Sequence, residues 1–297
     1  MKNGIRYTFE DKIYYSIVYV VSILLLITIL YPVIVIVSSS FSSPQAVSTG
    51  QVVFLPVEPG LQGYAAVFRD ARVPIGYRNT IFYTVSGTLI NIALTLICAY
   101  PLARKQLPLR GFFMVYFAFT MLFGGGMIPN YILVRDLRML NTIWAIIIPG
   151  GFSVFNMIIT RTFISSSIPG ELLEATQIDG CNDFKYFFLF ILPLSKPVIA
   201  VMAIRYGVGH WNSFFSAFLY LTNSRLFPLQ VFLREILILS QFNPADIMDP
   251  ELAIAMQGLA DLLKYSLIVI STAPILCIYP FFQKYFVKGV MIGSLKG

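Results

Sequence analysis

Long apolar blocks, separated by shorter polar or charged segments, dominate the chain. A membrane-spanning helix needs roughly 20 mainly apolar residues, so this pattern predicts an all-α, polytopic membrane protein with six spans. The predicted spans cover residues 13–37, 80–103, 111–134, 142–163, 197–220 and 262–285. Segments 38–79, 124–141 and 221–261 are predicted to be loops on one side of the membrane, and segment 165–197 is predicted to be an insert on the other side.

Composition agrees with a chain that is solvated by lipid. Hydrophobic residues make up 57% and charged residues 12% of the 297 residues, whereas a soluble domain has roughly 25% charged residues. The first apolar block is too long for the core of a signal peptide and no clear cleavage site follows it, so we interpret it as a retained helix. The chain is therefore predicted to be a single membrane domain over 1–297.

Basic residues indicate the orientation. With the N-terminus inside, the inner segments hold twelve Lys or Arg residues and the outer segments seven or eight. Cytoplasmic segments carry an excess of such residues, so both termini are predicted to be cytoplasmic. The net charge of +7 is spread thinly between apolar blocks, which does not favour binding to nucleic acid.

Catalytic motifs are missing from the sequence. It contains no GxxxxGK[ST] loop for ATP, no HExxH motif and no paired carboxylates within an apolar block. His210 is the single histidine, and the three cysteines do not cluster. We therefore expect no catalytic residue, no metal site and no enzymatic activity in this chain.

The insert at 165–197 predicts two short helices. Pro169 suits a first helical turn, and Glu171 and Glu174 suit the positive end of the helix dipole. Gly180 suits a residue just past a helix end, where a positive φ is often required. The first helix is therefore expected to be two to three turns long and to stop at Asp179-Gly180.

The second helix of the insert is expected to start at Asn182 or Asp183, since both residues are good caps. Its apolar residues recur at i, i+3, i+4 and i+7, which predicts one apolar face. That face comprises Phe184, Phe187, Phe188 and Ile191. A protruding amphipathic helix can dock into a groove of a partner protein or lie in the lipid headgroups, and the residues alone leave both possibilities open.

The insert resembles a known family at this point. Its pattern is Glu174-Ala175-Thr176-x3-Gly180-x9-Phe190-x-Leu192-Pro193, which is similar to the EAA loop of binding-protein-dependent ABC importer permeases. It departs from the family at Thr176, where Ala is usual, and at Phe190, where Ile is usual. The resemblance implies a role in coupling to an ATPase for Glu171, Glu174, Ala175, Thr176, Asp179, Gly180, Leu192 and Pro193.

The resemblance extends over nearly the whole chain and is closest to permeases for oligosaccharides and acidic polysaccharides of the maltose-system type. It implies a membrane-spanning subunit of an ATP-driven sugar importer in the bacterial inner membrane. The implied partners are a second, homologous permease chain, two copies of a cytoplasmic ABC ATPase, an extracytoplasmic sugar-binding protein and membrane lipid. ATP and Mg are expected on the ATPase, with no cofactor on this chain.

Polar residues within the apolar blocks are candidates for the substrate pathway. Charged side chains at membrane depth are costly unless they face protein or water, and a sugar needs hydrogen bonds and aromatic faces. The candidates are Asn91, Asn156, Arg205, His210, Trp211 and Asn212. The alternative for each polar candidate is a hydrogen bond to a neighbouring helix.

Three other functions compete with the carbohydrate importer. An ion-coupled secondary transporter would be expected to show internal repeats or carboxylates within the spans, and we find neither in the sequence. An ABC permease for a non-sugar solute such as a peptide is the next alternative. A purely structural membrane subunit would not need the long outer loops and the polar fifth span.

Overall fold

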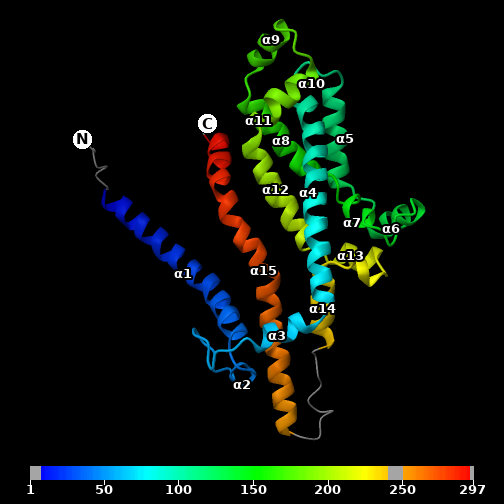
Figure 1. Cartoon of the computed structure of the whole chain (residues 1–297). Coiled ribbons are helices and arrows are strands. Elements are labelled where there is room, and N and C mark those ends of the chain that lie inside the picture. Colours follow the sequence, from blue (N-terminus) through cyan, green and yellow to red (C-terminus); the bar gives the residue numbers. More distant parts are fainter. Residues whose placement is uncertain (1–7, 240–249, 295–297) are drawn as a thin grey trace. The chain divides into compact units, whose positions relative to one another are not determined.

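The computed structural model describes residues 8–239 and 250–294 (Figure 1). Every element in these residues is a helix, which confirms the predicted all-α class. The chain divides into two compact units. Unit 1 comprises the described residues of 1–70 and 235–272, and unit 2 those of 71–234 and 273–297.

Unit 1 contains α1 (Phe9–Ser40), α2 (Pro44–Ser48), α3 (Gln62–Arg69) and the first part of α15 (Pro250–Ser294). A capping box between Thr8 and Asp11 starts α1. Two serines in the last turn of α1 contact the segment that follows the helix. The Ser38 hydroxyl donates to the carbonyl of Phe54 at 2.6 Å, and the Ser40 hydroxyl lies 2.8 Å from the Tyr64 hydroxyl. These bonds hold the segment after α1 against the helix end.

Unit 2 contains most of the helices. They are α4 (Arg72–Ala103), α5 (Arg110–Leu122), α6 (Met127–Asp136), α7 (Trp144–Ile147), α8 (Val154–Ser167), α9 (Gly170–Ile178), α10 (Asp183–Tyr186), the π-helix η1 (Phe187–Ile191), α11 (Leu192–Leu194), α12 (Lys196–Trp211), α13 (Phe215–Tyr220) and the 3₁₀-helix η2 (Ser224–Leu226). The helix α14 (Leu229–Leu239) begins in unit 2, and α15 ends there. The long helix α4 packs against α8 and α12 (Figure 1).

The buried side of α4 holds small and polar residues besides apolar ones, and large apolar residues lie on its exposed side. Its buried positions include the small or polar residues Gly76, Asn79, Thr80, Gly87, Asn91 and Thr95. Its exposed positions include Ile81, Phe82, Val85, Leu89 and Ile97. In lipid, apolar side chains gain nothing by leaving the surface, and small or polar residues let helices approach and bond. The pattern is therefore that of a helix inside a membrane.

The predicted spans are only partly continuous helices. Among the described residues, three helices are long and apolar enough to cross a membrane, in Phe9–Ser40, Arg72–Ala103 and Met256–Phe281. Two bent pairs raise this number to five at most: α5 with α6, bent by 109°, and the segment Asp183–Leu194 with α12, bent by 76°. The described residues therefore do not contain six unbroken spans.

Turn residues account for the breaks. The predicted span 142–163 divides into α7 and α8 because Pro149, Gly150 and Gly151 stand between them. The predicted span 197–220 ends at Trp211, with Asn212 as the C-cap, and α13 starts only at Phe215. In the predicted span 111–134, the bend comes at Gly126, which has φ +85°.

The predicted loops also contain helices. Segment 38–79 holds α2, α3 and the first turns of α4, and segment 124–141 holds α6. Segment 221–261 holds η2, α14 and the start of α15, and its residues 240–249 lie outside the described part.

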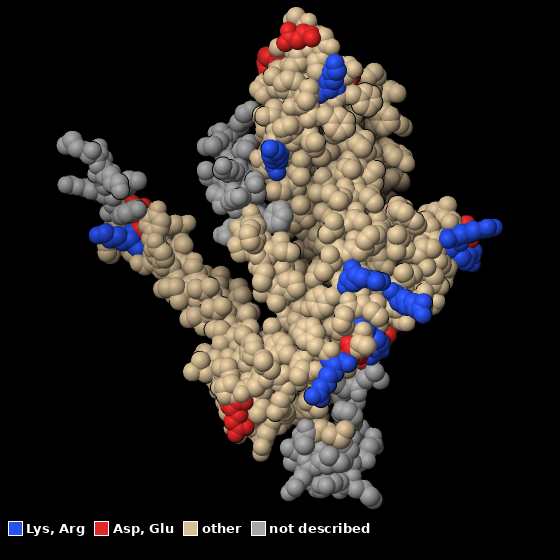
Figure 2. Space-filling model, in the orientation of Figure 1, with Lys and Arg blue, Asp and Glu red and all other residues tan. Residues whose placement is uncertain are grey.

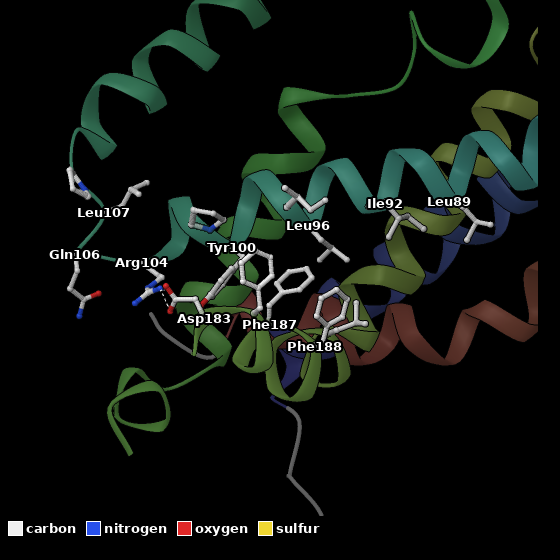
Figure 3. A pocket seen from close by; sticks show the side chains of 16 residues that line it. Leu89, Ile92, Leu96, Tyr100, Arg104, Gln106, Leu107, Asp183, Phe187 and Phe188 are labelled. Atoms are coloured by element: carbon white, nitrogen blue, oxygen red, sulfur yellow. Dashed lines mark hydrogen bonds and ion pairs between the residues drawn. The ribbon is translucent and has the colours of Figure 1, made fainter. Parts of the chain in front are cut away.

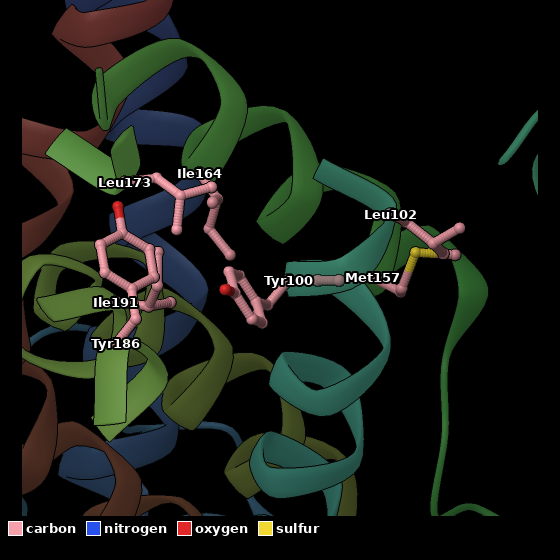
Figure 4. Packing of buried hydrophobic residues seen from close by; sticks show 8 residues of the cluster. Tyr100, Leu102, Met157, Ile164, Leu173, Tyr186 and Ile191 are labelled. Atoms are coloured by element: carbon pink, nitrogen blue, oxygen red, sulfur yellow. The ribbon is translucent and has the colours of Figure 1, made fainter. Parts of the chain in front are cut away.

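A buried apolar cluster forms the core at the α9 end of unit 2 (Figure 4). Its members come from α4 and from the consecutive elements α8, α9, α10 and η1, which lie at least 50 residues further along the chain than α4. They are Ala99, Tyr100, Leu102, Met157, Ile164, Leu173, Tyr186 and Ile191. The cluster joins the predicted insert to two of the helices that form the membrane part of unit 2.

Candidate functional site

The helix α9 projects an acidic tip. Glu171, Glu174 and Ala175 are exposed, and Ile178 at its end is 88% exposed. Figure 2 shows acidic atoms at the end of unit 2 where α9 lies. Of the predicted coupling residues, Glu171, Glu174, Ala175 and Asp179 lie on one accessible surface together with Ile178, whereas Thr176 is buried. We call this surface the α9 tip (Glu171, Glu174, Ala175, Ile178 and the following Asp179).

The opposite side of α9 is anchored in the core. Leu173 is 8% exposed and belongs to the buried cluster (Figure 4). Thr176 is also buried, and its hydroxyl donates to the carbonyl of Leu173 at 2.9 Å. The departure from Ala at this position is therefore accommodated, because the extra hydroxyl has its own hydrogen bond.

Gly180 ends α9 as the sequence predicts. It has φ +79°, in the left-handed region that favours glycine. The amide of Cys181 donates to the carbonyl of Thr176 at 2.9 Å, and the amide of Gly180 donates to that of Gln177 at 3.0 Å. This pair of bonds is the Schellman motif. Pro169 lies one position earlier than predicted, as the N-cap of α9.

Asn182 caps the next helix by accepting a hydrogen bond from the amide of Lys185 at 2.9 Å, as predicted. The predicted apolar face lacks one of its four residues, since only Phe184, Phe187 and Phe188 lie along one side. Ile191 is buried, whereas Phe184 is 79% and Phe188 is 58% exposed. The π-helix η1 has more residues per turn than an α-helix, so Ile191 rotates into the core and the two phenylalanines do not.

An open apolar groove of about 830 Å³ lies between α4 and the α10–η1 segment (Figure 3). Phe184, Phe188 and Leu192 line it together with Leu89 and Leu96 of α4. Near one end, the Arg104 guanidinium donates to the carboxylate of Asp183 at 2.6 Å. The two phenylalanines thus face this groove. Pro193 lies next to it in α11 and is exposed.

Two pathway candidates bind one another. His210 Nε2 lies 2.9 Å from Oδ1 of Asn91, and Nδ2 of Asn91 donates to the carbonyl of Gly150 at 2.6 Å. Both side chains are buried. The Gly150 carbonyl lies in the break between α7 and α8 and has no partner within a helix, so Asn91 supplies its hydrogen bond. Backbone polar groups at membrane depth need such a partner.

Arg205 and Asn156 form a second pair. Nε of Arg205 donates to Oδ1 of Asn156 at 2.9 Å. The guanidinium carbon also lies 5.1 Å from the ring centre of Phe155, which is a cation–π contact. Asn156 is buried, but Arg205 is exposed on α12. The arginine is therefore held from one side and accessible from the other.

The last two candidates have different environments. Trp211 is buried, with its ring centre 6.3 Å from that of Tyr77. Asn212 is exposed, and its amide donates to the carbonyl of Val208 at 3.0 Å. Arg205 and Asn212 are thus the two pathway candidates that are accessible on this chain.

Sequence reasoning did not identify several residues of these sites. Leu173 anchors α9, Tyr186 and Tyr100 connect the insert to α4, and the Arg104–Asp183 ion pair closes the same junction. For Leu173, the sequence did contain an indication. Leu173 and Thr176 are three positions apart, so they share one side of α9, while Glu171 and Glu174 lie on another side.

Comparison with known proteins identifies the family. Residues 77–292 match the family model described as the inner membrane component of binding-protein-dependent transport systems. The chain belongs to this family. The match includes α9, the buried cluster and all the pathway candidates.

Two Bacillus subtilis (strain 168) proteins resemble the whole chain. The polygalacturonan/rhamnogalacturonan transport system permease protein YtcP is 35% identical over 97% of this chain and 100% of its own length. Protein LplC is 41% identical over 91% of this chain and 90% of its own length. The similarity to these two relatives therefore extends along more than nine tenths of the chain.

A solved structure supports the same fold. A crystal structure of a bacterial ABC transporter involved in the import of the acidic polysaccharide alginate contains a chain that matches with a TM-score of 0.84 and 32% identity. The match covers 95% of this chain and 100% of that chain. The chain is thus an inner membrane component of a binding-protein-dependent transport system.

Proposed function

We propose that this chain is one of two membrane-spanning permease subunits of an ATP-driven importer for oligosaccharides, including uronate-containing ones. The single observation that carries the proposal is the construction of α9. One of its sides, at Leu173 and Thr176, is packed into the core, and its α9 tip is exposed. A short helix that is anchored in this way moves with α4 and α8 when a partner moves it.

The α9 tip is the surface that would dock on the ATPase. Glu174 lies on it, and Gly180 provides the tight stop that keeps α9 short. ATP would bias the transporter by binding better to its closed state, and unit 2 would follow as a rigid body. Leu192 and Pro193 lie at the other end of the insert, where α11 turns into α12.

The partners that we propose are a second, different permease chain of the same family, two ATPase subunits and an extracytoplasmic sugar-binding protein. ATP and Mg would bind to the ATPase subunits, so this chain would transmit force and carry out no hydrolysis. The basic inner segments support cytoplasmic termini and a cytoplasmic position for α9. Lipid would cover the apolar side of α4.

The substrate class is supported by the relatives. YtcP is named for polygalacturonan and rhamnogalacturonan, and the structural neighbour takes part in the import of alginate. Each of these polysaccharides contains uronate units. We therefore propose oligosaccharides with carboxylate groups as substrates of this importer.

The test is ATP hydrolysis by the transporter purified with its native ATPase and binding protein and reconstituted in proteoliposomes. Uronate oligosaccharides should stimulate hydrolysis in the wild type, and Glu174→Ala should abolish most of the stimulation. Glu10→Ala, an exposed acidic residue in the first turn of α1, is the matched control and should behave as the wild type. Failure to purify with any ATPase, or transport on an ion gradient without ATP, would contradict the proposal.

A further inference from the structure

Arg205 has an uncommon position for a charged residue in this chain. It lies on α12 about 14 Å along the helix from Lys196, at roughly 1.5 Å per residue. This distance places it near the middle of a hydrocarbon layer about 30 Å thick. A charged side chain at that depth faces protein or a water-filled space rather than lipid. Its exposure on this chain therefore marks a surface that something polar must cover.

The guanidinium charge is not neutralised within the described part of the chain. Ion pairs in that part include Arg104 with Asp183, Arg135 with Asp136 and Lys264 with Asp261, and none of these pairs involves Arg205. Arg205 makes one hydrogen bond, to the neutral amide of Asn156, and one ring contact, to Phe155. An anion from outside this set of residues is the chemical group that would complete the site.

The two contacts orient the guanidinium. Asn156 is 5% exposed, and its Oδ1 accepts the hydrogen bond from Nε of Arg205. The Phe155 ring lies against the guanidinium. The two Nη groups make no hydrogen bond to a described residue. Two parallel N–H groups in one plane match the two oxygens of a carboxylate. The arrangement is thus a pre-oriented carboxylate receptor, with Asn156 as its positioning residue.

The same side of α12 can accept a sugar. Gly209 and Asn212 follow Arg205 at i+4 and i+7, and both are exposed. Nothing lies within 4 Å of a Cβ built at Gly209, so a sugar ring can approach the backbone there. The Asn212 amide can bond to hydroxyl groups. The face formed by Arg205, Gly209 and Asn212 therefore combines one anion receptor with room for a pyranose.

The geometry points to Arg205 as a specificity-determining residue that binds the carboxylate of a uronate unit in the translocation pathway. This inference rests on the proposed function. It assigns the choice between acidic and neutral sugars in part to this chain, in addition to the binding protein. The competing assignment is an ion pair between Arg205 and a carboxylate of the second permease.

The test compares trigalacturonate with its fully methyl-esterified form, which has the same length and no charge, as substrates for ATP-dependent uptake into proteoliposomes. The ratio of acid to ester uptake is the readout. The binding protein is the same in every sample, so a change in this ratio comes from the membrane subunit. Arg205→Gln should lower the ratio about tenfold or more. Arg205→Lys should give an intermediate ratio, because lysine keeps the positive charge but lacks the two parallel N–H groups of the guanidinium.

Two further variants separate positioning from packing. Asn156→Ala should lower the ratio less than Arg205→Gln does. This variant keeps the positive charge of Arg205 but removes the hydrogen bond that orients its guanidinium. The exposed Arg78→Gln on α4 is the matched control and should leave the ratio unchanged. Co-purification with the ATPase is measured for each variant, so that failure of the complex to assemble is seen separately from a change in specificity.

Several outcomes would overturn the inference. An equal fall in acid and ester uptake, or loss of the second permease from the purified complex of Arg205→Gln, would assign Arg205 to a structural ion pair. An unchanged ratio in an assembled complex would also contradict it, as would a wild type that takes up neither trigalacturonate nor trimannuronate. In each of these cases, intact co-purification of the wild type with the ATPase and ATP-driven uptake of another oligosaccharide would leave the proposed importer standing.

Discussion

Nε2 of His210 lies 2.9 Å from Oδ1 of Asn91, although the two residues are 119 positions apart in the sequence. Asn91 also donates to the carbonyl of Gly150, so one side chain joins α4, α12 and the break between α7 and α8. The two polar residues thus satisfy each other and the irregular backbone beside them. Their placement inside unit 2 explains why polar groups are tolerated here at membrane depth.

We expect Asn91→Leu to destabilise the protein by about 1–3 kcal/mol, because it leaves the His210 ring and the Gly150 carbonyl without their partner. The measurement is the thermal unfolding midpoint in detergent. Asn130→Leu, at an exposed position on α6, is the control and should change the midpoint little. An Asn91→Leu protein as stable as the control would mean that the three-way contact contributes nothing.

Gly87→Ala should also lower the unfolding midpoint. A Cβ at Gly87 would meet the His210 ring at 2.5 Å, so α4 and α12 would have to separate or the ring would have to leave Asn91. Overpacking of this kind costs about 1–3 kcal/mol. Gly111→Ala in α5, where nothing lies within 4 Å, is the matched control. A small gain in stability is expected for the control, since Ala favours the helix.

Leu173 and Ile178 should separate anchoring from docking. Leu173→Ala removes a buried side chain from the cluster and should cost about 2 kcal/mol or more of stability, with weaker coupling of ATP hydrolysis to substrate. Ile178→Ala, at an 88% exposed position, should leave the unfolding midpoint unchanged and weaken only the sugar-stimulated hydrolysis. If both variants lose stability equally, Ile178 is not on a free surface.

Gly180→Ala should strain the end of α9. A non-glycine residue in the left-handed region costs about 1–2 kcal/mol, and relief of this strain would extend or tilt the helix. We expect reduced sugar-stimulated ATP hydrolysis with normal insertion into the membrane. Gly170→Ala at the start of α9, which has open space around it, is the control. Equal sugar-stimulated hydrolysis in the two variants would show that the Schellman motif at the end of α9 is not needed for coupling.

The elements that could be predicted from the sequence are those with local causes. The first and second spans lie within α1 and α4, and the limits of α9 follow from Pro169 and Gly180, which act on their own backbone. The broken spans were predicted as continuous because apolar length outweighed the turn signal of Pro149-Gly150-Gly151. The π-helix η1 could not be predicted either, since the spacing of the apolar residues indicated an ordinary α-helix there.

By itself, the sequence determined that this is an all-helical membrane chain whose insert contains a short helix with exposed acidic residues. The length of apolar blocks, the helix caps and the glycine conformations depend on neighbouring residues, so the sequence contains them directly. Only the tertiary structure decided which polar residues face inward. Asn91, Asn156, Arg205 and His210 are equally polar in the sequence. The packing of α4, α8 and α12 pairs Asn91 with His210 in the interior and leaves Arg205, supported by Asn156, exposed on α12.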